Sequence, residues 1–322
     1  MPELRWEPPD PSANAAWLHL LAACEAVDRW GEIYTEPDLD DEWKSVWVTP
    51  ERDGRFVWDG DQLVGFAWPK VIPGTRDFHK VDLWGAVRPS HRHHGIGARL
   101  VDWQIERGVE ALAELEPSIP SKLTVNAHPE HVGLLELAAA RGFAVERTFL
   151  EVVRATALPL APMPPPAGVE LLPFDPRLDE ATRSAHAEAF ADHWGSEPRS
   201  EEEWRQWYTG HRGFRLDLSR LALDPSSGDV VGYVLCAAYP ADWDIQPVEA
   251  WINTVGTRPA WRGRGIGGAL MTAVLAAIER ADTGFERSIL GVDSENPTGA
   301  LRLYRRLGFE DERTVLTLAR AV

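Results

Sequence analysis

The chain is a tandem duplication, and this internal repeat constrains its fold more than any other feature of the sequence. Residues 142–155 match residues 308–321 with eight of fourteen positions identical, at an offset of 166. Residues 88–97 match residues 258–267 at an offset of 170. Because both the order and the spacing are kept, the 322-residue chain is predicted to fold as two similar domains.

A proline-rich stretch separates the two repeats. Residues 158–167 contain five prolines, and proline is disfavoured in helix interiors and in central strands. We therefore predict an N-terminal domain at residues 1–157, a stiff linker at residues 158–167 and a C-terminal domain at residues 168–322.

Within each repeat, the hydrophobic pattern predicts the same order of elements. A short strand is followed by two helices, a β-hairpin, and then strands alternating with helices until a closing strand. In the first repeat, the hairpin is indicated by Asp59-Gly60-Asp61 between two apolar runs. The predicted fold class is α/β (α+β), with two tandem domains, each a mixed, mostly antiparallel sheet flanked by helices.

The acidic composition limits the possible partners. The formal net charge of −17 argues against nucleic acid or an anionic membrane surface as a partner. The charge suits a cationic or amine substrate, and solubility alone is the more common reason for it. We expect a small-molecule partner and either a monomer or a homodimer.

The cysteines and the first residues of the sequence indicate the compartment. Cys24 and Cys236 both lie in apolar surroundings, which is typical of buried thiols in a reducing compartment. The first residues lack the basic and then apolar pattern of a signal peptide, and no stretch approaches the length of a membrane span. We therefore expect a cytoplasmic protein.

An unusual stretch lies between a predicted strand and a predicted helix of the second repeat. Residues 257–268 hold three arginines and four glycines. Glycines bring bare N–H groups close to a ligand, and a helix N-terminus adds partial positive charge, so a phosphorylated ligand is predicted here. The stretch also satisfies the dinucleotide pattern Gly-x-Gly-x-x-Gly, but the next strand does not end on an acidic residue at the required distance.

The order of elements and the pattern Arg262-x-x-Gly265-x-Gly267 resemble the GNAT superfamily of acyl-CoA N-acyltransferases. A second similar segment runs from Asn296 to Phe309, so the resemblance covers nearly the whole chain, twice. Two such units in one chain resemble the tandem-domain type of this superfamily, to which the mycothiol synthases belong. The resemblance implies an N-acetyltransferase that transfers an acetyl group from acetyl-CoA to a small-molecule primary amine by direct attack in a ternary complex.

The resemblance also implies which residues hold coenzyme A. Backbone N–H groups of the Arg/Gly loop would hold the pyrophosphate, and the pantetheine arm would lie along the preceding strand, where that strand splays from its neighbour. In the second repeat these positions are Val255, Gly256, Thr257, Arg262, Gly263, Arg264, Gly265, Ile266, Gly267, Gly268 and Asn296. In the first repeat they are Ala86, Val87, Arg92, His93, His94, Gly95, Ile96 and Gly97. Because two histidines replace a glycine and an arginine in the first repeat, coenzyme binding there is left open.

The resemblance assigns a general acid to the second repeat alone. Tyr304, four residues before Gly308, aligns with the tyrosine that many members of the superfamily use as proton donor. A phenol with an unperturbed pKa of about 10 can protonate a departing thiolate. The alternative is a packing tyrosine on an amphipathic helix. The corresponding residue of the first repeat is Ala138, so the N-terminal domain is predicted to be catalytically degenerate.

The residues on the acceptor side are less specific. Glu249 is a candidate general base acting through water, or else a solvated carboxylate at the end of a strand, and Asp293 is a weaker candidate base. Asp192 and Trp194 lie in the segment expected to border the acceptor, or in an ordinary packing loop. No metal site is predicted. Two alternatives stay open for the function: acetylation of a cysteinyl amine, as in the mycothiol synthases, and a non-catalytic protein that binds coenzyme A as a sensor or interaction module.

Overall fold

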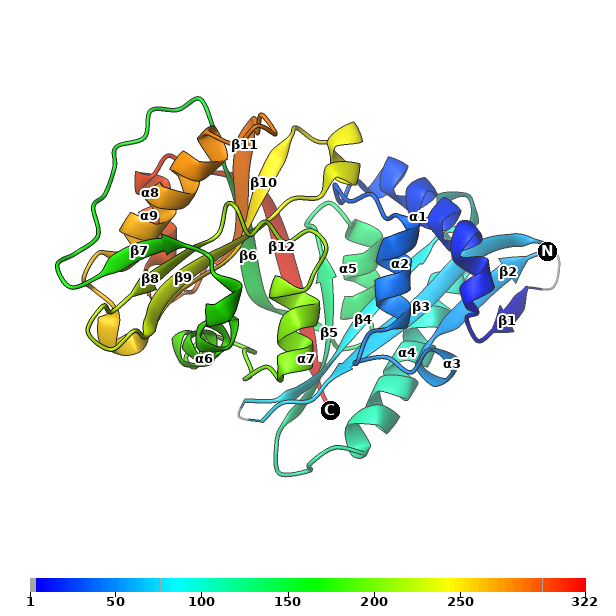
Figure 1. Ribbon diagram of the computed structural model, residues 1–322. Helices are drawn as coiled ribbons and strands as arrows, with labels where there is room; N and C mark the ends of the chain where they lie inside the picture. Colours follow the sequence, from blue (N-terminus) through cyan, green and yellow to red (C-terminus); the bar gives the residue numbers. More distant parts are fainter. Residues whose placement is uncertain (1–3, 76, 297) are drawn as a thin grey trace. The chain divides into compact units, whose positions relative to one another are not determined.

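The computed structural model describes residues 4–75, 77–296 and 298–322. The chain divides into two compact units, whose elements are labelled in Figure 1. Unit 1 comprises Met1–Arg147 and Leu316–Val322, and unit 2 comprises Thr148–Val315.

Unit 1 is built on a sheet with the strand order β1-β2-β3-β4-β5-β12. Its strands are β1 (Arg5–Glu7), β2 (Arg55–Asp59), β3 (Gln62–Ile72), β4 (His79–Val87), β5 (Ser121–Ala127) and the last part of β12 (Glu310–Ala321). Its helices are α1 (Asn14–Asp28), α2 (Glu36–Trp43), α3 (Pro50–Asp53), α4 (Ile96–Ala113) and α5 (Val132–Ala139). Neighbouring strands are antiparallel except for β4 and β5.

Unit 2 repeats this plan with the strand order β6-β11-β10-β9-β8-β7. Its strands are β6 (Ala144–Ala155), β7 (Glu170–Pro173), β8 (Arg220–Leu223), β9 (Val230–Ala237), β10 (Glu249–Thr257) and β11 (Arg287–Asp293). Its helices are α6 (Asp179–Ala189), α7 (Glu201–Trp204), α8 (Ile266–Glu279) and α9 (Ala300–Arg306). Here β10 and β11 form the parallel pair. The predicted mixed, mostly antiparallel sheet with flanking helices is confirmed in both units.

The closing strands are exchanged between the repeats. From Phe149 to Ala155, β6 pairs with β11 of unit 2, although β6 ends the first repeat of the sequence. From Leu316 to Ala321, β12 pairs with β5 of unit 1, although β12 ends the second repeat. The predicted domains at residues 1–157 and 168–322 follow the repeats and stay a prediction, whereas the compact units divide within β6 and β12.

Both faces of the sheet in unit 2 are covered by helices (Figure 1). Ala185 of α6 and Trp204 of α7 pack with Tyr233 on one face. Leu270 of α8 and Tyr304 of α9 belong to the core on the opposite face. Side chains alternate between the faces along each strand, so the two faces present different residues to the helices.

The proline-rich segment at residues 158–167 contains no helix or strand. Leu160 and Met163 of this segment pack against the α8 and α9 core of unit 2, and the Met163 N–H donates to the Thr272 hydroxyl at 3.3 Å. Among the described residues, none of the helices is both long enough and apolar enough to cross a membrane.

Candidate functional site

In unit 2, β10 leaves its neighbour β11 after only a few residues. Their parallel pairing covers Glu249, Ala250 and Trp251, so the second half of β10 has no β11 partner. On its other side β10 pairs with β9, with a register shift between Ile252 and Thr254 that makes a bulge. The second half of the strand therefore offers backbone N–H and C=O groups that an extended, amide-containing ligand can pair with.

The Arg/Gly loop follows β10 and leads directly into α8. Gly263 and Gly265 have φ values of 75° and 89°, which side chains rarely adopt. A Cβ placed on either glycine would meet no atom within 4 Å, so the space beside the loop is open. The first N–H groups of α8 and its helix dipole favour an anion at this end. Residues 257–268, which comprise the loop and the start of α8, form the unit 2 cradle.

Arg262 of the cradle is engaged within the protein. Its guanidinium makes a bidentate ion pair with Asp192, with N–O distances of 2.5 and 3.0 Å. It also donates to the Ala189 carbonyl at 2.6 Å. The hydrogen bond from Arg262 is the main cause that lowers the pKa of Asp192. Asp192, predicted to bind the acceptor, thus holds Arg262, which was predicted to bind the pyrophosphate.

The other cradle arginines differ from each other. Arg258 pairs with Glu188 at 3.2 Å. Arg264 is exposed and stacks over the Trp261 ring at 4.6 Å, and no carboxylate among the described residues forms a salt bridge with it. The positive character available to a ligand here comes from the helix end, the loop backbone and Arg264.

Gly267 and Gly268 lie in the first turn of α8, where they face packed side chains. A Cβ on Gly268 would lie 2.7 Å from the sulfur of Met163 in the proline-rich segment. A Cβ on Gly267 would touch Leu303 of α9 at 3.6 Å. Ile266 between the loop and this turn is buried. These residues bring α8 close to its neighbours and so hold the cradle in place.

Tyr304 lies on α9 in the core beside α8. It is only 6% exposed, and its ring packs edge-to-face on Phe309 at 6.0 Å. Within the described part of the chain, its hydroxyl makes no hydrogen bond. Burial raises the pKa of Tyr304 to about 12, so the phenol keeps its proton at neutral pH.

Glu249 begins β10 and is only 4% exposed. Its carboxylate pairs with Arg287 at 2.7 Å and accepts a hydrogen bond from the Trp251 indole at 3.1 Å. Arg287 also pairs with Glu312 at 2.9 Å. The alternative of a solvated carboxylate at a strand end is wrong, because the group is buried and paired. Its role as general base stays a prediction.

The segment after α6 meets the loop after β11. Asn296 donates from its amide to Nε2 of His193 at 3.0 Å, and its amide oxygen accepts from the Thr298 N–H at 2.8 Å. Trp194 lies half-buried in the same segment, and Asp293 at the end of β11 is buried. Asn296 is therefore held beside the predicted acceptor segment, and its coenzyme contact stays a prediction.

A buried histidine that sequence reasoning missed lies beneath β10. His186 Nδ1 is 2.6 Å from the Tyr233 hydroxyl, and Nε2 is 3.4 Å from the Tyr208 hydroxyl. Burial lowers the pKa of His186 to about 3, so the ring is neutral. A Cβ on Gly256 would lie 2.4 Å from the Tyr233 ring. Gly256 thus makes room for Tyr233. A glycine and a tyrosine facing each other on adjacent predicted strands were the sequence signal that could have indicated this buried cluster.

Unit 1 has the same backbone plan with different side chains. β4 pairs with β5 only as far as Asp82, which leaves Ala86 and Val87 without a β5 partner, and its pairing with β3 has no register shift. His93 takes φ 64° at the position of Gly263. Arg92 makes a bidentate pair with Asp28 at 2.7 and 2.6 Å.

The rest of the predicted unit 1 cradle resembles that of unit 2. His94 and Gly95 are exposed, Gly97 is half-buried and Ile96 is buried at the start of α4. Ala138, which corresponds to Tyr304, is buried in the unit 1 core. Both units therefore have a splayed strand and a cradle. Among the described residues, the bulge in the splayed strand and the tyrosine at this helix position occur in unit 2.

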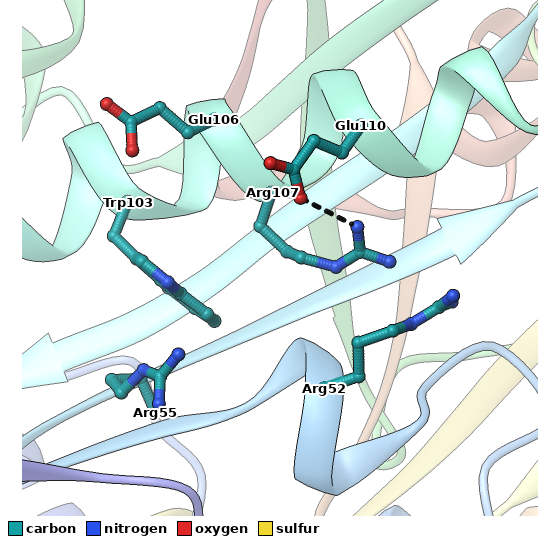
Figure 2. Close-up of a pocket in the computed structure, with 6 residues that line it drawn as sticks. All are labelled: Arg52, Arg55, Trp103, Glu106, Arg107 and Glu110. Atoms are coloured by element: carbon teal, nitrogen blue, oxygen red, sulfur yellow. Dashed lines mark hydrogen bonds and ion pairs between the residues drawn. The ribbon is translucent and has the colours of Figure 1, made fainter.

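A separate pocket of about 300 Å³ lies against α4 in unit 1 (Figure 2). It is lined by Arg52, Arg55, Trp103, Glu106, Arg107 and Glu110. Arg107 pairs with Asp53 at 2.7 Å and with Glu110 at 3.1 Å, and Arg55 stacks over Trp103 at 4.6 Å. The pocket is therefore a charged recess on the surface of α4, in which Arg107 is held by Asp53 and Glu110. The described residues contain no group of three histidine, cysteine or acidic side chains suited to a metal ion.

A sequence profile described as the acetyltransferase (GNAT) family matches residues 15–126 and 180–309, once in each repeat. The chain belongs to the GNAT family. Its members use acetyl-CoA in general, and this GNAT protein is an acyl-CoA-dependent acetyltransferase. The resemblance inferred from the Arg/Gly loop is thereby confirmed, and the alternative of a non-catalytic module is wrong.

Similar proteins match this chain over most of their length. The mycothiol acetyltransferase of Thermobispora bispora is 31% identical over 79% of this chain and 79% of its own length. That of a Parafrankia species is 28% identical over 92% of this chain and 91% of its own. A GCN5-related N-acetyltransferase from Sphaerobacter thermophilus superimposes with a TM-score of 0.75 at 25% identity, covering 99% of this chain and 95% of that one.

A tandem GNAT protein from the clavulanic acid biosynthesis pathway also superimposes on this chain. The TM-score is 0.73 at 18% identity, covering 99% of this chain and 98% of that one. At this identity the likeness concerns the fold alone.

Proposed function

We propose that unit 2 transfers an acetyl group from acetyl-CoA to the primary amine of a small molecule. The observation that carries this proposal is the bulged, half-unpaired β10 leading into an open cradle. A ligand with an amide-containing arm and a pyrophosphate matches this combination of unpaired backbone and helix N-terminus. Bound acetyl-CoA would supply an acetyl thioester.

In this proposal each part of the coenzyme has a place in unit 2. Residues 255–257 of β10 pair with the amides of the pantetheine arm, on the side that β11 leaves unpaired. The backbone N–H groups of residues 262–267 hold the pyrophosphate, assisted by the exposed Arg264 guanidinium. Arg262 acts indirectly, because its ion pair with Asp192 fixes the loop.

The chemistry follows from a neutral amine attacking the thioester carbonyl in a ternary complex. A C–N bond forms and the C–S bond breaks, while a β10 backbone N–H near Val255 stabilises the negative charge on the carbonyl oxygen. Tyr304 gives its proton to the departing thiolate. The proton lost by the amine passes through water to a carboxylate, for which Glu249 is the candidate from the sequence.

A cysteinyl amine is the second candidate acceptor. It is favoured by the relatives, several of which carry the name mycothiol acetyltransferase.

Release of free thiol from acetyl-CoA, measured against a panel of small primary amines that includes a cysteinyl amine, tests the proposal. Turnover with one class of amine, and its loss in Tyr304→Phe, is expected. Binding of acetyl-CoA without thiol release across the panel would overturn the proposal. Equilibrium binding also counts the coenzyme sites, and two per chain would show that unit 1 binds coenzyme as well.

A further inference from the structure

One face of the unit 2 sheet carries several charged side chains, of which only Glu249 has a part in the proposed chemistry. On β11, Leu290 and Val292 belong to the core beneath α8. Because side chains alternate along a strand, Arg287 and Gly291 face the opposite side, the one covered by α6 and α7. Glu249 is on that side too, since it pairs with Arg287.

Gly291 leaves an open space on this face. It is exposed, and a Cβ placed on it would meet no atom within 4 Å. Directly opposite, on the exchanged strand β6, stands Glu151. Residues directly opposite in an antiparallel pair point to the same face with Cβ atoms about 5 Å apart. Glu151 therefore borders the open space above Gly291.

Glu151 is held more loosely than Glu249. Its side chain is 19% exposed, and its ion pair with Arg313 is long, at 3.5 Å. Glu249 is 5% exposed at the side chain and is bound by Arg287 at 2.7 Å. Burial raises the pKa of Glu151. The nearby carboxylates of Glu249 and Glu312 raise this pKa further, whereas Arg313 and Arg287 lower it. Of the two carboxylates, Glu151 is the more exposed and the less tightly paired.

Glu151 also lies close to the bulge of β10. The parallel pairing ends at Trp251 with Ile289, two residues before Asn253 in the bulge of β10 and two residues before Gly291 on β11. At this last paired position, β6 lies two strand spacings from β10, roughly 10 Å. Glu249 stands four residues before Asn253 along β10, roughly 13 Å away. Glu151, opposite Gly291, thus lies beside the point where β10 leaves β11.

We propose that Glu151 binds the ammonium group of the acceptor and takes its proton through water, which selects small cationic amines. The carboxylate becomes a neutral acid as the ammonium becomes the attacking amine, and the acid then releases the proton to solvent. This inference rests on the function proposed for unit 2. Because Glu151 belongs to the first repeat, the exchanged strand lets that repeat complete the site of the second.

The corresponding residues of unit 1 have lost these carboxylates. Thr317 aligns with Glu151 in the repeat, and its hydroxyl donates to the Asn126 side chain at 2.7 Å. His79 occupies the place of Glu249 and pairs with β5 as Glu249 pairs with β11. The acidic pair is therefore specific to the unit that also carries Tyr304.

The test compares Glu151→Gln with Glu151→Asp and with a matched control, Glu310→Gln, which alters an exposed carboxylate on β12. Amine kcat/KM is measured against pH by thiol release, and the Kd of acetyl-CoA by equilibrium binding. Glu151→Gln is expected to lower kcat/KM by about 100-fold at neutral pH. The loss should shrink as the pH approaches the pKa of the amine, because the amine then deprotonates unaided. Glu151→Asp should recover part of the rate, Glu310→Gln should match the wild type, and all three should bind acetyl-CoA normally.

Wild-type kcat/KM and pH dependence in Glu151→Gln would overturn this inference and leave the proposed function standing. Loss of acetyl-CoA binding in Glu151→Gln and Glu151→Asp alike would also overturn it, because the residue would then be structural. If Glu151→Gln fails to fold, an unshifted pH profile in Glu151→Asp overturns the inference and a shifted acidic limb supports it. A wild type that releases no thiol with any amine instead overturns the proposed function.

Discussion

The loop after β4 in unit 1 and the loop after β10 in unit 2 follow the same path with different residues. His93 takes φ 64° where Gly263 takes 75°, and both loops lead into a helix whose first residue, Ile96 or Ile266, is buried. The arginine that starts each tight turn is tied to an aspartate in both units. The cradle is thus a property of the fold, because packing and ion pairs maintain it even where the side chains facing a ligand have changed.

The groups proposed to carry chemistry differ more than the cradle does. Unit 2 has a bulge in its splayed strand, a buried tyrosine on α9 and acidic side chains on the open face. Unit 1 has an unbroken register, Ala138 and His79 at these positions. The two units therefore share a framework and differ at the groups proposed to carry chemistry, since the framework is what stabilises each unit.

The largest effect is expected at Tyr304, the tyrosine that unit 2 has where unit 1 has Ala138. Tyr304→Phe should lower kcat by about 100-fold, because general acid catalysis contributes about that much or more. Burial raises the pKa of Tyr304 to about 12, so its deprotonation should cause no fall in wild-type rate below about pH 11. Thiol release from pH 6 to pH 10 measures both. Full turnover of Tyr304→Phe at every pH would remove Tyr304 from the mechanism.

The next largest effect concerns one packed position within each splayed strand, Gly256 in unit 2 and Ala86 in unit 1. Gly256→Ala should destabilise unit 2 by about 1–3 kcal/mol, the usual cost of overpacking, because the new Cβ would lie 2.4 Å from the Tyr233 ring. Unit 1 pairs Ala86 with Phe66 at the same place. Ala86→Gly should therefore change stability by less than about 1 kcal/mol. Urea unfolding followed by tryptophan fluorescence gives both values, and equal effects would show that the two strands are packed alike.

Exchanging the cradle residue sharpens the comparison further. Gly263→His gives unit 2 the residue of unit 1, at a φ of 75° that costs a side chain about 1 kcal/mol or more. The imidazole would also occupy space now open beside the loop. The Kd of acetyl-CoA should rise roughly tenfold, which is about 1.4 kcal/mol. Isothermal titration measures it, and an unchanged Kd would place the coenzyme elsewhere.

The smallest effect is expected at the ion pairs behind the two cradles. Asp192→Asn should cost about 0.2–1 kcal/mol, since the carboxylate is 48% exposed and screened by solvent. The pKa of Asp192 is lowered in the folded protein. The pair therefore stabilises above the unfolded pKa of about 3.9 and is lost as the pH falls through the lower folded value. Melting curves at pH 7 and pH 3 should show the difference from wild type shrinking at pH 3.

Asp28→Asn is the unit 1 partner of that variant. Asp28 is 19% exposed at the side chain, so its loss should cost more than the loss of Asp192. The same melting curves compare the two variants. A larger effect for Asp192 would contradict the idea that burial sets the strength of these pairs.

The sequence by itself determined the duplication, the fold class and the place of each cradle. These depend on local patterns: the hairpin at Asp59-Gly60-Asp61 forms as predicted between β2 and β3, and α8 begins at Ile266 directly after the Arg/Gly loop. Turn residues, helix starts and alternating apolar positions act over a few neighbouring residues, so they can be recognised without knowing what packs against them.

Only the tertiary structure decided which partners these elements have. The alternation along β6 shows two faces, but it does not say that the strand pairs with β11 of the other unit or that Glu151 stands opposite Gly291. Likewise, Arg262 and Asp192 are 70 residues apart in sequence, and each taken alone could have faced a ligand. Strand neighbours and ion pairs of this kind depend on long-range packing, because many partners satisfy the same local pattern and the assembled core selects one.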